Sequence, residues 1–318
     1  MKLAILTSGG DAPGMNAAIR AFVRRGLADH HTLWGIQRGF EGLMRSDPLP
    51  LAAASVANIL MTGGTILKTS RYVDFFDPDV RRRAADTLKR WRMDGLAVLG
   101  GNGSLAGALE LHRAGVPVVG IPASIDNDIA GTDYSIGFDT AVNNIVQSID
   151  KIRDTASAHE RIFVVQVMGN HSGALAIAAG LACGAEAVII PERPPDFDAI
   201  KSQLAQTYAR GKKHSFLIVA EGAGDAQSVA QEVASRTGHE AKWAVLGHTQ
   251  RGGPPTAHDR IMAALYAEKA IAMFGQGTSG VMVAARGTTI DSVPLTEVVQ
   301  GRQHAPLSWL ELTEILAR

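Results

Sequence analysis

The sequence has little of several features that mark other classes of protein. It contains a single cysteine, Cys183, so an intramolecular disulfide is excluded and a packed thiol is expected. Lys and Arg total 31, as do Asp and Glu, and this balance provides no overall field to attract nucleic acid or an acidic membrane. The first apolar run is too short for a signal peptide, and no run approaches the roughly 18 residues of a membrane span. We therefore expect a cytoplasmic protein without nucleic-acid or membrane partners, in which any anion binding is local.

What the chain does have is 46% hydrophobic residues and 34 glycines, enough for a buried core. Short apolar runs, then glycine turns, then longer amphipathic stretches recur along it, which is typical of parallel strands joined by helices. Strands are predicted at 2–6, 32–36, 96–99, 116–121, 162–167, 187–190, 215–220, 242–246 and 281–285. Helices are predicted at 16–27, 80–91, 104–113, 141–157, 172–182, 197–209 and 259–274. The sequence thus predicts an α/β fold with two packed sheets.

Two glycine loops follow predicted strands and open predicted helices. Residues 7–14 read Thr-Ser-Gly-Gly-Asp-Ala-Pro-Gly, and residues 100–104 read Gly-Gly-Asn-Gly-Ser. Free backbone N–H groups and the positive end of a helix dipole at such a turn can hold a phosphate, although an ordinary strand-to-helix turn looks the same. The second loop also comes close to a dinucleotide fingerprint, Gly101-x-Gly103-x-x-Ala106, so a nicotinamide dehydrogenase remains an alternative. Residues 63–69 lack the glycine that precedes the lysine of a Walker A loop.

Acidic and basic side chains follow two other predicted strands. Asp126 and Asp128 come after the strand at 116–121, where one carboxylate can serve a metal and the other can accept a proton. Phosphoryl transfer needs this division of roles, whereas the alternative is a solvated acidic turn. His248 and Arg251 lie in a flexible Gly247–Gly253 turn and can bind a phosphate monoester.

Four segments in the same order and spacing resemble the phosphofructokinase family: residues 7–20, 100–104, 125–141 and 247–253. The likeness spans nearly the whole chain, and the length is similar to that of the short bacterial 6-phosphofructokinases. The resemblance implies two Rossmann-like three-layer α/β/α domains: a nucleotide-binding one of residues 1–138 plus about 251–300, and a sugar-phosphate-binding one of residues 139–250 plus about 301–318. It also implies a homotetramer with active sites shared between subunits. The expected reaction is glycolytic: ATP, with Mg²⁺ present, phosphorylates the 1-hydroxyl of fructose 6-phosphate.

The resemblance also assigns roles to residues. Asp126 matches the general base, Asp128 and Asn102 match the magnesium site, and Ser124 matches a hydroxyl that contacts the sugar or the transferring phosphate. The matched nucleotide pocket consists of Gly10, Arg71, Tyr72, Gly101, Asn102, Gly103, Ser104 and Gly107. The matched sugar-phosphate pocket consists of Ser124, Asp126, Asp128, Met168, Gly169, Asn170, Glu221, His248 and Arg251, with Arg161 and Lys242 reaching in from a neighbouring subunit.

Three residues depart from the family pattern. Asn102 replaces the aspartate of a Gly-Gly-Asp-Gly-Ser loop, and an amide oxygen binds magnesium more weakly. Asn170 replaces the arginine of a Met-Gly-Arg motif, and Lys242 replaces an arginine that binds the 6-phosphate. The alternatives are therefore a kinase of a different phosphorylated sugar, a pyrophosphate-using member, or a weakly active regulatory paralogue. Small residues at Gly103 and Ala123, where pyrophosphate users typically carry Asp and Lys, favour ATP.

An effector site is only partly matched by the same comparison. Matching residues are Arg20, Arg24, Arg153, Glu186, Arg210, Lys212 and His214, while Ala53 and Asn58 lack the usual arginine and aspartate. Without the resemblance, the run 210–214 would be interpreted as a solvated loop.

Overall fold

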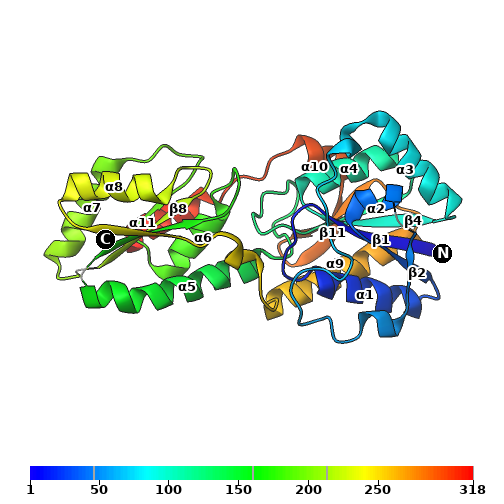
Figure 1. Cartoon of the computed structure of the whole chain (residues 1–318), viewed down its shortest axis with the longest axis horizontal. Coiled ribbons are helices and arrows are strands. Elements are labelled where there is room, and N and C mark those ends of the chain that lie inside the picture. The colour runs from blue at the N-terminus through cyan, green and yellow to red at the C-terminus, as the bar shows by residue number, and fades with distance from the viewer. Residues whose placement is uncertain (46, 160, 213, 318) are drawn as a thin grey trace. The chain divides into compact units, whose positions relative to one another are not determined.

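The computed structural model describes residues 1–45, 47–159, 161–212 and 214–317, without the side chains of 157–159. The expected effector run 210–214 is therefore described except for Lys213, which lies outside these ranges. The chain divides into two compact units (Figure 1). Unit 1 comprises Met1–Ile125, Ile129–Thr140 and Arg251–Gln303, and unit 2 comprises Asp126–Asp128, Ala141–Gln250 and His304–Arg318.

Unit 1 is built on a sheet with the order β11-β10-β5-β4-β1-β2-β3, seven strands within the described ranges. The strands are β1 (Lys2–Ser8), β2 (Thr32–Ile36), β3 (Leu49–Leu51), β4 (Gly95–Gly100), β5 (Val118–Pro122), β10 (Val281–Arg286) and β11 (Thr289–Pro294). The inner pairs are parallel, and the two outermost strands pair antiparallel with their neighbours. Strands β4 and β5 are buried along their whole length, as expected for parallel strands covered on both faces.

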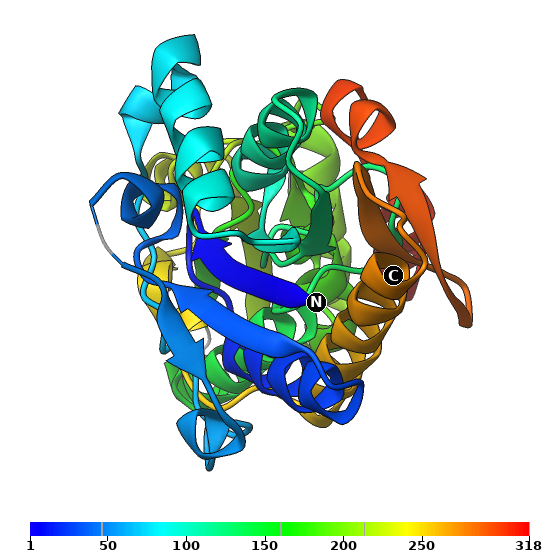
Figure 2. The same ribbon diagram turned by 90° about the vertical axis from the view of Figure 1, so that its right-hand side faces the viewer.

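Helices cover both faces of this sheet (Figure 2). One face is covered by α1 (Met15–Ala28) and α9 (Ala257–Gly275). The other is covered by α2 (Gly39–Arg45), α3 (Pro78–Arg90), α4 (Asn102–Arg113) and α10 (Leu295–Gln300), whose apolar side chains form one cluster with those of β1, β4 and β10. Short 3₁₀ turns, η1 (Ala53–Val56) and η2 (Val73–Phe76), lie in the connections. Because α1 and α4 each begin just after a sheet strand, their amino ends lie at the carboxyl edge of the sheet.

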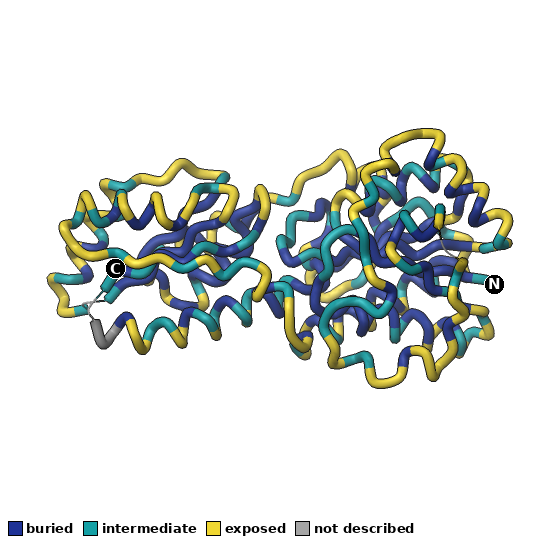
Figure 3. Tube along the Cα trace, viewed as in Figure 1, coloured by how far each residue is buried: buried dark blue, intermediate teal, exposed yellow. Residues whose placement is uncertain are grey.

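Unit 2 has a parallel sheet with the order β7-β8-β6-β9, four strands among the described residues. Its strands are β6 (Ile162–Val167), β7 (Ala187–Ile189), β8 (Ser215–Ala220) and β9 (Ala241–Val245). Its helices are α5 (Phe138–His159), α6 (Ala174–Cys183) and α11 (Leu307–Leu316) on one face and α7 (Phe197–Ala209) and α8 (Ala226–Thr237) on the other, with a 3₁₀ turn η3 (Gly247–Arg251) after β9. The inner strands of both sheets are among the most buried parts of the chain (Figure 3), whereas the edge strand β9 is largely exposed.

The predicted α/β fold with three-layer units is confirmed, and so is the packed thiol. Burial raises the pKa of the Cys183 thiol to about 11. Strands β3 and β11 escaped prediction because one is a three-residue edge strand containing Pro50 and the other carries polar Thr289, Asp291 and Ser292 instead of an apolar run. Within the described ranges, no helix carries an apolar stretch long enough to span a membrane.

Candidate active site

Three loops leave the sheet of unit 1 at the same level. Gly100, the last residue of β4, is in register with Ser8 at the end of β1 and with Pro122 at the end of β5. The loops that follow carry the first glycine segment, the second glycine segment and Ser124. Adjacent carboxyl ends of parallel strands are where α/β proteins bind ligands. The structure therefore brings these three predicted segments together.

The first loop ends in a left-handed glycine. Gly14 has φ 100° and is the N-cap of α1, and the described residues give it no side-chain cap. A Cβ on Gly14 would lie 2.6 Å from the Ile136 side chain, so the position requires glycine. Thr69 Oγ1 donates to Gly9 O at 2.7 Å, which ties the segment carrying the predicted residues Arg71 and Tyr72 to this loop.

Arg251 also reaches the first loop. Its Nη1 donates to the Asp11 carbonyl at 3.0 Å, and a Cβ on Gly10 would overlap its guanidinium group. The resemblance assigns Gly10 to the nucleotide and Arg251 to the sugar phosphate, and the structure places the two side by side. A fixed guanidinium beside a glycine turn is a suitable anion-binding arrangement.

The second loop combines open space with close packing. A Cβ on Gly101 would lie 3.7 Å from the Ala123 carbonyl, whereas one on Gly103 would have no atom within 4 Å among the described residues. Gly107 differs, because a Cβ there would lie 2.8 Å from the ring of Phe40. That ring stacks on Phe75 with centroids 4.1 Å apart. Sequence reasoning missed both phenylalanines, since their contact with Gly107 is not local in the chain.

The predicted acidic pair follows β5. Asp126 and Asp128 are half-buried and flank Asn127, whose φ of 48° is left-handed, a conformation that asparagine adopts more readily than most residues. Ser124, just before them, donates its backbone N–H to Ile136 O at 3.0 Å and accepts a hydrogen bond from Ser135 Oγ at 2.7 Å. The backbone on the amino side of the acidic pair is thus anchored on both of its polar groups.

In unit 2, two further predicted segments meet at the carboxyl edge of the sheet. Val167 of β6 is in register with Ala220 of β8, so the loop Met168–Asn170 and Glu221 leave the sheet side by side. The backbone N–H of Asn170 donates to Glu221 Oε1 at 2.8 Å, and Asn170 has φ 53°. Met168 donates its N–H to Oε1 of Gln250 at 3.1 Å; this glutamine is fully buried and was missed from sequence. His248 is exposed on η3.

Arg161 and Lys242 lie elsewhere, at the amino edge of the same sheet. Arg161 immediately precedes β6, and Lys242 lies on β9, which pairs with β6. The two share one carboxylate: Arg161 Nε lies 2.8 Å and Lys242 Nζ 2.5 Å from the two oxygens of Glu240. The hydrogen bond from Lys242 and the charge of Arg161 hold the pKa of Glu240 below its usual value. Glu240 was missed, although it immediately precedes β9 and its spacing of two residues from Lys242 places both side chains on the same side of the extended chain.

Four of the predicted effector residues also gather at this amino edge. Buried Glu186 accepts from Lys212 Nζ and, at 2.7 Å, from the backbone N–H of Phe216. The Phe216 ring contacts the Arg153 guanidinium, 4.7 Å from its centroid, and the edge of His214. Burial, followed by the charges of Lys212 and Arg153, lowers the pKa of His214. Arg210 instead donates to its own helix, and Arg20 and Arg24 lie on α1 in unit 1.

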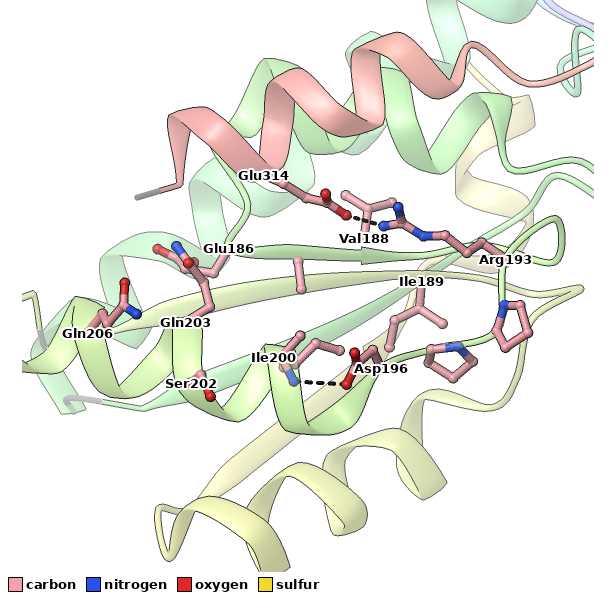
Figure 4. A pocket seen from close by; sticks show the side chains of 14 residues that line it. Glu186, Val188, Ile189, Arg193, Asp196, Ile200, Ser202, Gln203, Gln206 and Glu314 are labelled. Carbon is pink, nitrogen blue, oxygen red and sulfur yellow. Dashed lines mark hydrogen bonds and ion pairs between the residues drawn. The ribbon is translucent and has the colours of Figure 1, made fainter.

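Glu186 also lines a cavity of about 590 Å³ in unit 2 (Figure 4). The cavity lies along β7 between α7 and α11, and Arg193 and Glu314 form an ion pair across one side of it. Asp196 caps α7 at another side, accepting from the N–H of Ala199 at 2.9 Å. The charged side chains that line this cavity therefore already have protein partners.

Comparisons with known proteins point in one direction. A family model described as phosphofructokinase matches residues 2–274. The ATP-dependent 6-phosphofructokinase of Halalkalibacterium halodurans is 44% identical over 316 residues, and that of Brevibacillus brevis is 46% identical over 316 residues; each match covers 99% of this chain and 99% of the relative. Among solved structures, phosphofructokinase from Saccharomyces cerevisiae superposes with a TM-score of 0.88 and 34% identity over 99% of this chain, which spans 47% of that longer chain.

Proposed function

The chain belongs to the phosphofructokinase family, and we propose that it is an ATP-dependent 6-phosphofructokinase, which converts fructose 6-phosphate and ATP to fructose 1,6-bisphosphate and ADP. The observation that carries this proposal is the meeting of the two glycine loops and Ser124 at one edge of the unit 1 sheet. Membership of this family leaves no place for the nicotinamide dehydrogenase, because that alternative rested on the second glycine loop alone.

Asp126 is the residue that we propose as general base. It takes the proton of the sugar 1-hydroxyl while that oxygen attacks the γ-phosphorus and the bond to the ADP oxygen breaks. The anchored backbone of Ser124 supports this role, since a base must be held within hydrogen-bond reach of the proton that it removes. The backbone N–H groups at the starts of α1 and α4 are suited to binding the phosphates of ATP.

Mg²⁺ is the metal that suits the available donors. No group of three His, Cys, Asp or Glu side chains arranged to hold a metal ion occurs in the described part of the chain. Magnesium does not need one, because it keeps several waters and binds through one or two carboxylates and substrate phosphates. Asp128 would supply the carboxylate and Asn102 an amide oxygen, and the bound ion would neutralise phosphate charge.

The open space at Gly103 supports ATP as the phosphoryl donor. In the residues that the structure describes, nothing lies within 4 Å of a Cβ there, so the backbone of this loop is open to a ligand. Ala123 is buried and uncharged, and it adds no cation of the kind that pyrophosphate users carry.

We further propose a homotetramer whose active sites are shared between subunits. Arg161 immediately precedes β6 and Met168 immediately follows it, so these two predicted sugar-phosphate residues lie about 20 Å apart along the six-residue strand. One fructose 6-phosphate cannot span that length, which supports donation of Arg161 and Lys242 to another subunit. On β9, the exposed side chains of Trp243 and Val245 provide apolar surface beside Lys242 for such a contact.

A kinase of another phosphorylated sugar is the second candidate, favoured by the loop at Asn170. Its left-handed φ of 53° and its backbone hydrogen bond to Glu221 suit asparagine, and the side chain provides no cation for the transferring phosphoryl group. Asn170→Arg distinguishes the candidates. It should raise fructose 6-phosphate turnover if the missing cation only limits rate, and lower it if Asn170 selects another acceptor.

The decisive assay incubates the purified protein with Mg²⁺, fructose 6-phosphate and either ATP or pyrophosphate, and measures fructose 1,6-bisphosphate directly. We expect bisphosphate from ATP. Turnover only with another sugar phosphate would establish the second candidate, and ligand binding without turnover of any acceptor would indicate a regulatory paralogue.

Replacing the proposed base tests the mechanism. Asp126→Asn should lower kcat by about 10³-fold, since general-base catalysis contributes about 10²–10⁴-fold. Asp128→Asn is the matched variant, and it should mainly raise the Mg²⁺ concentration needed for half-maximal rate. Near-wild-type kcat in Asp126→Asn would disprove the assignment, and Glu221 would then be the next carboxylate to test as the general base.

A further inference from the structure

A buried carboxylate in unit 1 has no role in the reaction as described so far. Asp259, in the first turn of α9, is fully inaccessible to solvent. Its Oδ1 accepts hydrogen bonds from Tyr134 Oη at 2.7 Å and Gly137 N at 2.6 Å. Its Oδ2 accepts from the backbone N–H of Thr140 at 2.9 Å and from the Thr140 hydroxyl. One side chain therefore gathers four donors from the seven-residue segment 134–140.

A second set of contacts joins the same two helix starts. Thr256, the N-cap of α9, donates from Oγ1 to Asp139 Oδ2 at 2.5 Å and from its backbone N–H to Thr140 Oγ1 at 3.0 Å. The amino ends of α5 and α9 are thus joined in both directions. Asp259 of α9 accepts hydrogen bonds from the start of α5, and Asp139 of α5 accepts one from the N-cap of α9. Asp139 is half-buried, its carboxylate accepts from Thr256 and its backbone N–H donates to Tyr134 Oη. Asp139→Asn keeps an accepting oxygen and the backbone N–H, and it therefore serves as the control.

The segment that Asp259 holds also holds the loop before the proposed base. Ser135 Oγ donates to Ser124 O at 2.7 Å, and Ile136 O accepts from Ser124 N at 3.0 Å. Ile136 further forms a parallel bridge with Ala123. Segment 134–140 therefore lies between Asp259 and Ser124, and Asp126 follows Ser124 by two residues.

The same segment packs against the first glycine loop. A Cβ on Gly14 would lie 2.6 Å from Ile136 and 3.6 Å from the Asp259 Cβ, and one on Gly137 would lie 2.7 Å from the Cβ of Ala12. A shift of segment 134–140 is therefore resisted on the Ala12–Gly14 side by close packing. On the Ser124 side, it is resisted by hydrogen bonds whose positions depend on Asp259.

We propose that Asp259 is a positioning residue for phosphoryl transfer: it holds segment 134–140 in place so that Ser135 and Ile136 fix Ser124 and, through it, the loop of the base Asp126. This inference rests on the proposed function. Each oxygen of Asp259 faces a backbone N–H, so both must accept a hydrogen bond. An asparagine has one accepting oxygen, and its NH₂ group would face a donor whichever way the amide is turned.

The kinetic test compares Asp259→Asn with Asp139→Asn in the full-length protein. Asp259→Asn should lower kcat by about 30-fold or more while the KM for ATP changes by less than about 3-fold, because misplacing a reacting group by about 1 Å can cost about 10²-fold in rate. Asp139→Asn should keep kcat within about 2-fold, because its bond to Thr256 does not carry Ser124. Unchanged kcat in folded Asp259→Asn protein, or equal losses in both variants, would overturn the proposal.

A variant with a smaller change keeps the proposal testable if Asp259→Asn does not fold. Tyr134→Phe removes one of the four donors, and with it the acceptor of the Asp139 backbone N–H, but leaves Gly137 and Thr140 in place. It should lower kcat by about 3- to 5-fold, a smaller share of the same positioning effect. A Tyr134→Phe enzyme with wild-type kcat would count against the proposal even if Asp259→Asn did not fold.

Hydrogen exchange separates failure of this inference from failure of the proposed function. In Asp259→Asn, the amide of Ser124 should exchange at least about 10-fold faster, because its acceptor Ile136 O is no longer held, while amides of β1 should keep wild-type protection. This measurement needs no substrate. It therefore decides the positioning role even if the wild-type protein phosphorylates no sugar phosphate, and unchanged protection at Ser124 would overturn it.

Discussion

The predicted ligand-binding residues of the two units differ in kind. In unit 1, half of the predicted nucleotide residues are glycines. Gly101 and Gly103 lie at the start of α4, and Gly103 has open space around it among the described atoms. In unit 2, several of the predicted residues are charged side chains that already have protein partners. Arg161 and Lys242 share Glu240, Lys212 contacts Glu186, and Glu221 accepts the backbone N–H of Asn170.

This contrast has an energetic consequence. A loop of backbone N–H groups is preorganised and can bind phosphate without breaking a contact within the protein. An anion that binds Arg161 and Lys242 must instead compete with the carboxylate of Glu240. Substitutions in unit 1 should therefore act through space and backbone geometry, with large effects. Substitutions of the partner carboxylates in unit 2 should act through charge, with smaller effects that depend on salt.

The largest effect is expected from placing a carboxylate in the open space at Gly103. Gly103→Asp should lower kcat/KM for ATP by about 10²- to 10³-fold, because a carboxylate beside the nucleotide phosphates costs several kcal/mol of like-charge repulsion. Gly103→Ala is the control and should keep kcat/KM within about 3-fold, since the methyl group meets no atom within 4 Å of the described protein. Retained ATP activity in Gly103→Asp would show that the nucleotide phosphates bind elsewhere.

A loss of folding stability is expected from substitution of Gly100, which is closely packed at the start of the second glycine loop. A Cβ on Gly100 would lie 2.5 Å from the Ser8 carbonyl and 2.6 Å from Ser104 Oγ, and the first of these is backbone in a central strand. Gly100→Ala should therefore lower the free energy of unfolding by about 2–3 kcal/mol, as overpacking a core does. Denaturant unfolding checks this value, with Gly103→Ala expected to match or slightly exceed the wild-type protein.

The same contrast explains which features could be predicted from sequence. The two glycine loops and the central strands depend on local patterns, a run of apolar residues followed by residues that permit a sharp turn, and these were located correctly. The edge strand β11 and the helix α8 were missed. Polar residues interrupt the first, and the second has only small residues, Ala226, Ala230 and Val233 among them, on its buried face.

Partners distant in the chain could not be inferred in this way. Asn170 and Glu221 are 51 residues apart, and Met168 and Gln250 are 82 apart. Nothing in the local sequence of Asp259 distinguishes a buried acceptor of four hydrogen bonds from a solvated acid in the first turn of a helix. The resemblance named residues that are predicted to contact ligands, so it did not identify residues such as these, which hold other protein groups.

A buried pair in unit 2 should have an intermediate effect. Glu186→Gln keeps an oxygen for the Phe216 N–H but removes the charge that faces Lys212, whose side chain is 39% exposed. Because that exposure screens the pair, the loss in free energy of unfolding should be about 1–2 kcal/mol, less than for a fully buried pair. Thermal unfolding as a function of salt measures it, and a loss as large as that of Gly100→Ala would contradict the ordering.

The smallest effect is expected at the exposed carboxylate of Glu240. Since the pKa of Glu240 is held low, chiefly by the Lys242 hydrogen bond, the carboxylate stays ionised and competes with an incoming phosphate at neutral pH. Glu240→Gln should therefore lower the KM for fructose 6-phosphate by about 2- to 4-fold at low ionic strength, and the difference should shrink towards about 0.5 M salt as screening grows. Glu232→Gln is the matched control. It breaks an exposed pair with Arg236 on α8 but frees neither predicted phosphate ligand, so its KM should equal the wild-type value. A KM that rises in Glu240→Gln would mean that Glu240 orients Arg161 and Lys242 for the phosphate instead of competing with it, and the contrast between the units would then lie in how each is preorganised.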